Sequence, residues 1–259
     1  MSEEPWLDEH FHVDDNFELL DGEKRAAARS RLSRSYAAAL ARTGNSELVQ
    51  LATKLRSCVP GSRCGSGACP QCGVAQKRAC IRGVVKRFEG RPTALLTVVP
   101  SDPALQPAKL RELVIEAHKT ALTKFLQVAG LASLELIGAL DLSWNTYGGA
   151  DTSRFWAPHW HSIIPDEALE EIRNRLCSFY PATLLVPEPV DIKPITITPP
   201  KAYSYTFKSV FDARHQYIYG DGSREKAVFE KINVGHPKFT TLALNLDRIG
   251  LKERVLELG

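Results

Sequence analysis

Four of the six cysteines are spaced as the ligands of a metal ion are. Cys58, Cys64, Cys69 and Cys72 follow the pattern Cys-x5-Cys-x4-Cys-x2-Cys in a segment rich in Gly, Ser and Pro. Four thiolates in tetrahedral array suit Zn²⁺, which stabilises a fold without redox chemistry. We therefore predict a structural zinc site, in which the Cys69–Cys72 step is the most specific part because its turn can point both sulfurs at one ion.

The remaining two cysteines are interpreted differently. Cys80 could replace Cys58 or Cys64 as a ligand, although we expect it on the helix that follows the cluster. Cys177 has apolar neighbours and is predicted to be an ordinary core residue. The alternative for the cluster is a set of buried free thiols, which is disfavoured because five cysteines fall within 23 positions.

A pair of histidines offers a second metal site in the segment 155–164, which reads FWAPHWHSII. Alternate residues of a strand share a face, so His159 and His161 project together and can clamp a divalent ion. The spacing alone is a weak signal, because such pairs are often plain core or surface residues. His10 and His12 have the same spacing in an acidic segment without a strand pattern, and we interpret them as incidental.

The strand predicted before this pair supplies a third ligand. Asp141 is an acid in the otherwise apolar run 136–143, and burying a carboxylate without a partner is costly. If the hairpin turns near Asp151, Asp141 faces His161 and Ser143 faces His159. This predicts a His-His-Asp site with open coordination positions; the alternative is an aspartate solvated near the strand end.

The elements that must hold these residues follow from hydrophobic periodicity. We expect helices at 21–43, 76–87, 105–128, 166–180 (capped by Asp166) and 201–211. A shorter helix is expected to open at 46, with Leu48, Leu51 and Leu55 on one stripe. We expect strands at 93–99, 134–144, 155–164 and within 184–197, with weaker candidates at 239–246 and 254–258. From residue 93 the order β-α-β-β-α-β-α predicts an α+β fold with a ferredoxin-like, split βαβ antiparallel sheet. The helices would cover one face and leave the other open to a ligand.

Composition and charge narrow the class of protein. The 259 residues are 44% hydrophobic and 24% charged, which is ordinary globular usage and disfavours disorder or a coiled coil. Residues 1–20 hold seven acids and no Lys or Arg, whereas residues 21–91 hold 15 Lys or Arg against four acids. This basic block indicates a nucleic-acid partner, and the alternative is a solvated helix face. Its candidate DNA contacts are Arg78, Arg82, Lys86 and Arg87.

The sequence also argues against a membrane partner. No window of 18 apolar residues exists, and the acidic N-terminus lacks the order of a signal peptide. We therefore expect a cytoplasmic protein, and nothing in the sequence indicates an oligomeric state.

Four segments together resemble one known family. His159–His161 resembles the histidine-hydrophobic-histidine (HUH) motif of single-strand endonucleases, and ALLTVVP at 94–100 resembles the first motif of rolling-circle replication initiators. DLSWN at 141–145 resembles the acidic segment before the histidines, where Glu is commoner than Asp. KAYSYTFK at 201–208 resembles the Tyr-x-x-Lys motif. The cysteine knuckle also resembles that of initiators and related transposases, so the resemblance covers roughly 58–215.

This resemblance implies a specific chemistry and three parts of the chain. Tyr205 would attack a DNA phosphodiester and leave a 5′-phosphotyrosyl link, with Lys208 stabilising the phenolate and Mg²⁺ or Mn²⁺ polarising the phosphate. Tyr203 is the rival nucleophile. The first part, 1–57, is an acidic tail with a basic helical segment. The second, 58–90, is a zinc knuckle, and the third, 91–259, is an HUH endonuclease domain.

Three functions remain in competition at this point. The first is an origin-nicking initiator or a related HUH transposase acting on single-stranded DNA. The second is a non-catalytic, zinc-containing nucleic-acid-binding protein. An RNA-binding ferredoxin-like module is less favoured, because the predicted strands lack a row of exposed aromatic residues for base stacking.

Overall fold

The computed structural model divides into two compact units, which are described separately. It describes residues 22–100, 105–148, 153–183, 186–196, 199–207, 211–217, 223, 228–232 and 239–259. The helical unit comprises Met1–Arg87, Thr196–Ser209 and Val234–Lys252. The sheet unit comprises Phe88–Ile195, Val210–Asn233 and Glu253–Gly259. The three parts expected from the sequence, 1–57, 58–90 and 91–259, assign residues 196–209 and 234–252 to the same part as the sheet. In the structure, these two segments belong to the helical unit.

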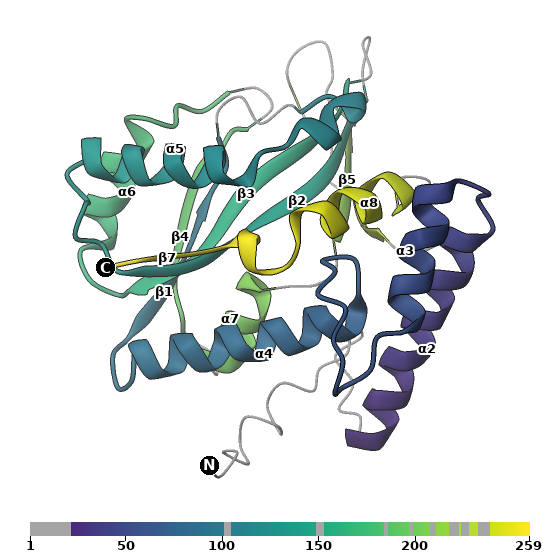
Figure 1. The fold of residues 1–259 in the computed structure, drawn as a ribbon. Helices are drawn as coiled ribbons and strands as arrows, with labels where there is room; N and C mark the ends of the chain where they lie inside the picture. The colour runs from purple at the N-terminus through teal and green to yellow at the C-terminus, as the bar shows by residue number, and fades with distance from the viewer. Residues whose placement is uncertain are drawn as a thin grey trace. The chain divides into compact units, whose positions relative to one another are not determined.

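The described part of the sheet unit is built on seven strands (Figure 1). They are β1 Thr93–Val98, β2 Leu136–Gly148, β3 Ser153–Pro165, β4 Val190–Pro194, β5 Phe211–Tyr217, β6 Val228–Ile232 and β7 Val255–Leu258. Their order is β4-β1-β3-β2-β5-β6, and β7 pairs with the first part of β2. The β2–β5 pair is parallel and the other pairs are antiparallel. The expected α+β class is confirmed, with a mixed rather than a purely antiparallel sheet.

Two helices lie side by side along one face of this sheet (Figure 1). Helix α5, Ile115–Val128, connects β1 to β2, and α6, Leu169–Cys177, connects β3 to β4. Phe125 and Tyr180 meet edge to face with ring centroids 5.0 Å apart, and Arg175 donates to the Ala129 carbonyl. These contacts fix the two helices to each other and leave the opposite sheet face for the polar residues of β2 and β3.

The helical unit gathers segments from both ends of the chain. Its helices are α2 Gly22–Ala41, α3 Ser46–Arg56, α4 Pro70–Arg87, α7 Pro199–Thr206 and α8 Phe239–Ile249. Helix α3 begins where Asn45 caps it by accepting from the Leu48 amide, and its buried stripe includes Leu51 and Leu55. Ser33 of α2 donates to the Leu55 carbonyl, which ties α2 to α3.

Helix α8 packs against both α3 and the cysteine loop. Lys54 of α3 forms an ion pair with Asp247 at 2.7 Å. A Cβ at Gly67 would lie 2.5 Å from the Leu246 carbonyl oxygen, so only glycine permits this approach of the loop to α8. The loop and α8 are therefore in backbone contact.

Several predicted elements differ from the structure. The strand predicted at 239–246 is wrong, because Leu242, Ala243 and Leu246 are buried at helical spacing in α8. The helix predicted at 105–128 is divided, since Leu105 exchanges backbone hydrogen bonds with Trp156 and α5 begins only at Ile115. Pro107–Glu112 between them forms a 3₁₀ helix, η1.

Three helix ends also need correction. Asp166 does not cap α6, because its amide donates to the Pro92 carbonyl and extends the sheet; α6 begins after Ala168, whose φ is +51°. Helix α4 begins at Pro70 rather than residue 76, since proline suits the first helical turn. Helix α7 ends at Thr206, before the predicted end at 211.

No helix among the described residues combines the length and the apolarity that crossing a bilayer requires.

Candidate metal centres

Strands β2 and β3 bring Asp141, His159 and His161 together, and we call these three residues the Asp141 cluster. In the ladder, Asp141 lies directly opposite His159, and Ala139 lies opposite His161. The predicted register was therefore wrong by two residues, because the pairing is symmetrical about position 150 rather than 151. A two-residue slip leaves every side chain on its predicted face, so the same three residues still converge.

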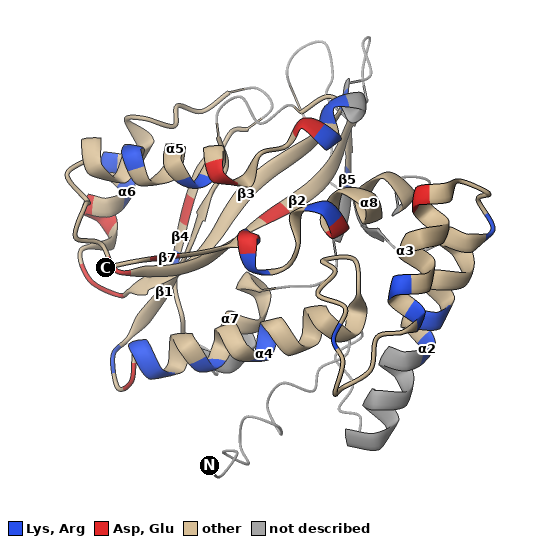
Figure 2. Cartoon of the chain, in the orientation of Figure 1, with Lys and Arg blue, Asp and Glu red and all other residues tan. Residues whose placement is uncertain are grey.

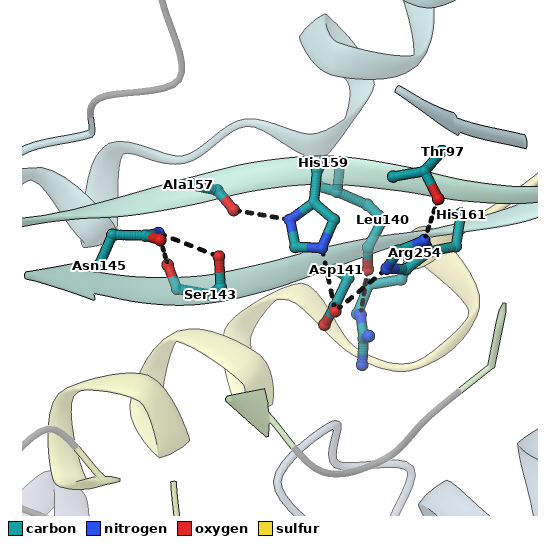
Figure 3. A network of polar contacts seen from close by, with 9 residues as sticks. All are labelled: Thr97, Leu140, Asp141, Ser143, Asn145, Ala157, His159, His161 and Arg254. Carbon is teal, nitrogen blue, oxygen red and sulfur yellow. Dashed lines mark hydrogen bonds and ion pairs between the residues drawn. The ribbon is translucent and has the colours of Figure 1, made fainter. Parts of the chain in front are cut away.

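The Asp141 carboxylate reaches both imidazoles (Figure 3). Asp141 Oδ2 lies 3.3 Å from His159 Nε2 and 3.7 Å from His161 Nε2. One ligand atom from each of the three residues lies within 4.8 Å of the others. Ligands held about 2.1 Å from a common ion are at most about twice that distance apart, so the two separations of 3.3 and 3.7 Å from Asp141 fit one divalent ion.

The proton positions also favour a cation between these groups. His159 Nδ1 lies 3.0 Å from the Ala157 carbonyl oxygen, which can only accept, so Nδ1 carries a proton. In a neutral imidazole, Nε2 then presents a lone pair to the Asp141 oxygen. Two acceptors that face each other at 3.3 Å need either a proton on one of them or a metal ion between them.

The cluster is buried but incompletely coordinated by protein. Asp141 is 1% exposed and His161 3% exposed, while His159 is half-buried. The two imidazole rings stand perpendicular, with centroids 4.8 Å apart. Three ligands leave positions open for water or a substrate oxygen, as catalytic rather than structural metal sites do.

A gap in the sheet lies beside Asp141. Strand β7 pairs with Leu136–Ala139 of β2, and β5 pairs with Trp144–Gly148. Within the described residues, the segment 140–143 thus has a strand neighbour only on its β3 edge. The buried Arg254 reaches into this edge, and its Nε donates to the Leu140 carbonyl at 3.0 Å. Sequence reasoning missed Arg254, whose only signal was a basic residue at the start of the last strand.

The cysteine cluster is formed by Cys58, Cys64, Cys69 and Cys72 in the helical unit. The Sγ atoms of Cys58 and Cys64 lie 3.5 and 3.6 Å from that of Cys72, and all four Sγ atoms lie within 4.8 Å of one another. Sulfurs about 2.3 Å from a tetrahedral Zn²⁺ are roughly 3.8 Å apart, so the group fits such an ion. The start of α4 at Pro70 places Cys72 in its first turn, beside Cys69.

The other cysteines lie outside this cluster. Cys80 is on α4 as expected, where Gln76 Nε2 donates to its sulfur. Cys177 is exposed at the end of α6, so its prediction as a core residue was wrong. The buried stripe of that helix is formed instead by Ile172 and Leu176.

The thiols of the cysteine cluster differ in acidity. Burial raises the pKa of Cys58, but donation from the Cys64 amide and from the neighbouring thiols outweighs it and lowers this pKa to about 7. Burial raises the pKa of Cys64 to about 11 and that of Cys69 further. Without metal, Cys58 therefore forms a thiolate readily, whereas the thiols of Cys64 and Cys69 stay protonated.

The two tyrosines of α7 differ in exposure. Tyr203 is 4% exposed, whereas Tyr205 is 48% exposed. Both belong to the helical unit, while the Asp141 cluster belongs to the sheet unit. Lys208 lies outside the described residues, as do His10 and His12.

Three of the five basic residues of α4 form a stripe. Arg78, Arg82 and Lys86 recur every four residues, so they share one side of the helix. Figure 2 shows Lys and Arg at positions along α4. Arg82 and Lys86 are exposed, while Arg78 and Arg87 are half-buried. The stripe can present positive charge to a polyanion.

Comparisons with known proteins give no match. No family model, no curated protein and no solved structure matches the chain.

Proposed function

We propose that the protein is a rolling-circle replication initiator of the HUH type, which nicks single-stranded DNA through a tyrosine. The observation that carries this proposal is the convergence of Asp141, His159 and His161 on one sheet face. Two imidazoles and one carboxylate with open positions are suited to a divalent ion that acts on a phosphate.

The strand order supports the same proposal. Strands β4-β1-β3-β2 are adjacent in that order and antiparallel, with one helix after β1 and one after β3. This order agrees with the split βαβ sheet expected for an HUH domain and so supports the proposal.

The metals in this proposal differ between the two clusters. His159, His161 and Asp141 would hold Mg²⁺ or Mn²⁺, which would polarise the scissile phosphate and stabilise its developing charge. The four cysteines would hold Zn²⁺, because four thiolates close the coordination sphere and serve folding rather than catalysis.

Tyr205 is the proposed nucleophile. Its phenolate oxygen forms a bond to phosphorus as the bond to the 3′ oxygen breaks, which leaves a 5′-phosphotyrosyl link and a free 3′-OH. An attacking phenol must reach solvent-borne DNA, and the exposed Tyr205 meets this requirement better than the buried Tyr203. A phenol with a pKa near 10 also needs a nearby cation, the role proposed for Lys208.

A non-catalytic, zinc-containing nucleic-acid-binding protein is the second candidate. The basic stripe of α4 and the cysteine cluster belong to the same helical unit, and together they would suffice for binding. Under this function neither the Asp141 cluster nor Tyr205 has a role in DNA cleavage.

Covalent capture of single-stranded DNA distinguishes these candidates. The full chain is incubated with Mn²⁺ and a labelled library of random single-stranded oligonucleotides, and label that stays on the protein in denaturing gels is measured. We expect an adduct that Tyr205→Phe abolishes and Tyr203→Phe retains. Because Tyr205 is exposed, its substitution should change the free energy of unfolding by no more than about 0.5 kcal/mol.

Two outcomes would change the assignment. An adduct lost only in Tyr203→Phe would move the nucleophile to Tyr203. The absence of any adduct, with DNA binding intact, would favour the non-catalytic candidate.

A further inference from the structure

The two histidines of the Asp141 cluster differ in what holds their second ring nitrogen. His159 Nδ1 is held by the Ala157 carbonyl, a backbone group that no substitution removes. His161 Nδ1 lies 3.0 Å from Thr97 Oγ1. A hydroxyl can donate or accept, so the tautomer of His161 depends on a side chain from another strand.

The sheet itself places Thr97 beside His161. In the β1–β3 ladder the two residues are directly opposite, and opposed side chains share a face with Cβ atoms about 4.5–5.5 Å apart. Thr97 is half-buried, and its β-branched side chain is restricted at χ1. The hydroxyl is therefore held in place at the His161 ring.

The distance from His161 to Asp141 indicates where the ring proton lies. His161 Nε2 and Asp141 Oδ2 are 3.7 Å apart, which is too long for a hydrogen bond, so Oδ2 does not accept a hydrogen bond from this nitrogen. An ion shared by the cluster needs the lone pair of His161 Nε2. In a neutral imidazole this puts the proton on Nδ1, where Thr97 Oγ1 can accept it.

We propose that Thr97 is a positioning residue for the metal site. Its hydroxyl oxygen accepts the Nδ1–H of His161 and holds the ring with Nε2 toward the ion that Asp141 and His159 share. This role rests on the proposed function, because it concerns the metal site of the same reaction. Loss of such an outer partner typically weakens metal affinity by about 10–100-fold.

Mn²⁺ affinity provides the first test and does not depend on DNA cleavage. Free Mn²⁺ is titrated by electron paramagnetic resonance against the full chain and three variants. Thr97→Val keeps the branched shape and removes the hydroxyl, and we expect its affinity to fall about 10–100-fold. Thr97→Ser restores the hydroxyl and should restore most of the affinity.

Thr93→Val is the matched control for the titration. Thr93 is buried on the same strand and the same face as Thr97, but it lies opposite Pro165. This variant should bind Mn²⁺ as the unchanged protein does. Wild-type affinity in Thr97→Val would overturn the proposal.

The tautomer of His161 gives a second test that needs no ion in the Asp141 cluster. Long-range ¹⁵N–¹H spectra of the protein with its zinc retained, and without Mn²⁺ or Mg²⁺, should show the proton of His161 on Nδ1. Thr97→Val should shift this population toward the Nε2–H form, and His159 should be unaffected because its partner is backbone. An Nε2–H form already present in the unchanged protein would overturn the proposal even if the protein bound no Mn²⁺.

Failure of the proposed function is distinguishable from failure of this inference. If Thr97→Val weakens Mn²⁺ binding but no covalent DNA adduct ever forms, Thr97 keeps its positioning role and the nicking function is wrong. If the adduct forms and Thr97→Val has unchanged affinity and tautomer, the nicking function stands and the role of Thr97 is wrong.

Discussion

Cys58, Cys64, Cys69 and Cys72 span 15 residues of one loop and the first turn of one helix, whereas Asp141, His159 and His161 come from two paired strands. The first group offers four soft ligands of one kind and closes around an ion. The second offers three ligands of mixed kind and leaves positions open. The difference separates an ion that would hold a segment together from an ion that would meet a substrate.

Removal of two cysteines should have the largest effect. Cys69→Ser with Cys72→Ser should abolish zinc binding and unfold the helical unit. Structural zinc supplies about 10–16 kcal/mol in small peptides, which is comparable to the whole stability of a domain. Metal analysis and far-ultraviolet circular dichroism measure the two effects, with about one zinc expected in the unchanged chain.

The exposed Cys177 provides the control for this prediction. Cys177→Ser should retain zinc and the folded helical unit. Zinc retained in the double variant would refute the assignment of these ligands.

Substitution in the Asp141 cluster should remove Mn²⁺ binding and DNA cleavage but leave the zinc in place. Asp141→Asn and His161→Ala should each lose Mn²⁺ affinity by more than the roughly 10–100-fold cost of an outer partner, and should abolish cleavage. Zinc content and DNA binding should persist, because phosphate contacts elsewhere supply most of the affinity. Mn²⁺ titration, metal analysis and a gel-shift assay measure these outcomes.

His118 on α5 is the control histidine for this pair. His118→Gln should leave Mn²⁺ binding unchanged. If replacement of His10 and His12 removed Mn²⁺ binding instead, the wrong pair of histidines would have been assigned.

The number of protons released on metal binding should differ between the two clusters. This is a smaller effect than those above, and it depends on pH. At pH 8 the thiols of Cys64 and Cys69 are protonated, since burial raises both pKa values above this pH. Zn²⁺ binding must displace these protons, so at least two should be released per zinc, and zinc affinity should still be rising with pH at about pH 11, because the pKa of Cys69 is higher still. Cys58, with a pKa of about 7, should contribute little at pH 8.

Calorimetry in two buffers of different ionisation enthalpy counts these protons. Mn²⁺ binding to the Asp141 cluster provides the comparison and should release fewer. Zinc binding without proton release would contradict the thiol assignment.

Neutralisation of the α4 stripe should have the smallest effect. Replacing Arg78, Arg82, Lys86 and Arg87 by Gln should flatten the salt dependence of single-stranded DNA affinity, by up to about 0.7 in the logarithmic slope per lost contact. Lys119→Gln with Lys124→Gln on α5 is the control and should leave the slope unchanged. An unchanged slope in the four-residue variant would indicate a solvated helix face.

The sequence predicted the candidate site best where the ligands are close together in the chain or alternate along a strand. The cysteine ligands are near neighbours in the chain, and the faces of His159, His161 and Asp141 follow from the period of two in a strand. The three predicted residues therefore still lie together although the predicted register was wrong, because a slip of two residues moves no side chain to the other face.

The parts that were missed depend on pairing between distant segments. Thr97 was recognised within a motif, but its contact with His161 requires the β1–β3 register. Arg254 reaches Leu140 only because β7 lies along β2. Helix α8 was read as a strand, because a short apolar run fits either period until its packing partner is known.

The close approach of Gly67 to Leu246 has a consequence for the order of events during protein synthesis. The loop between Cys64 and Cys69 leaves the ribosome early, whereas its partner helix α8 is made only after strands β1 to β6. At about 5–20 residues per second, roughly 10 to 40 s separate the two. A zinc ion captured by the cysteines within that interval would hold the loop in its final shape until the nascent chain delivers α8.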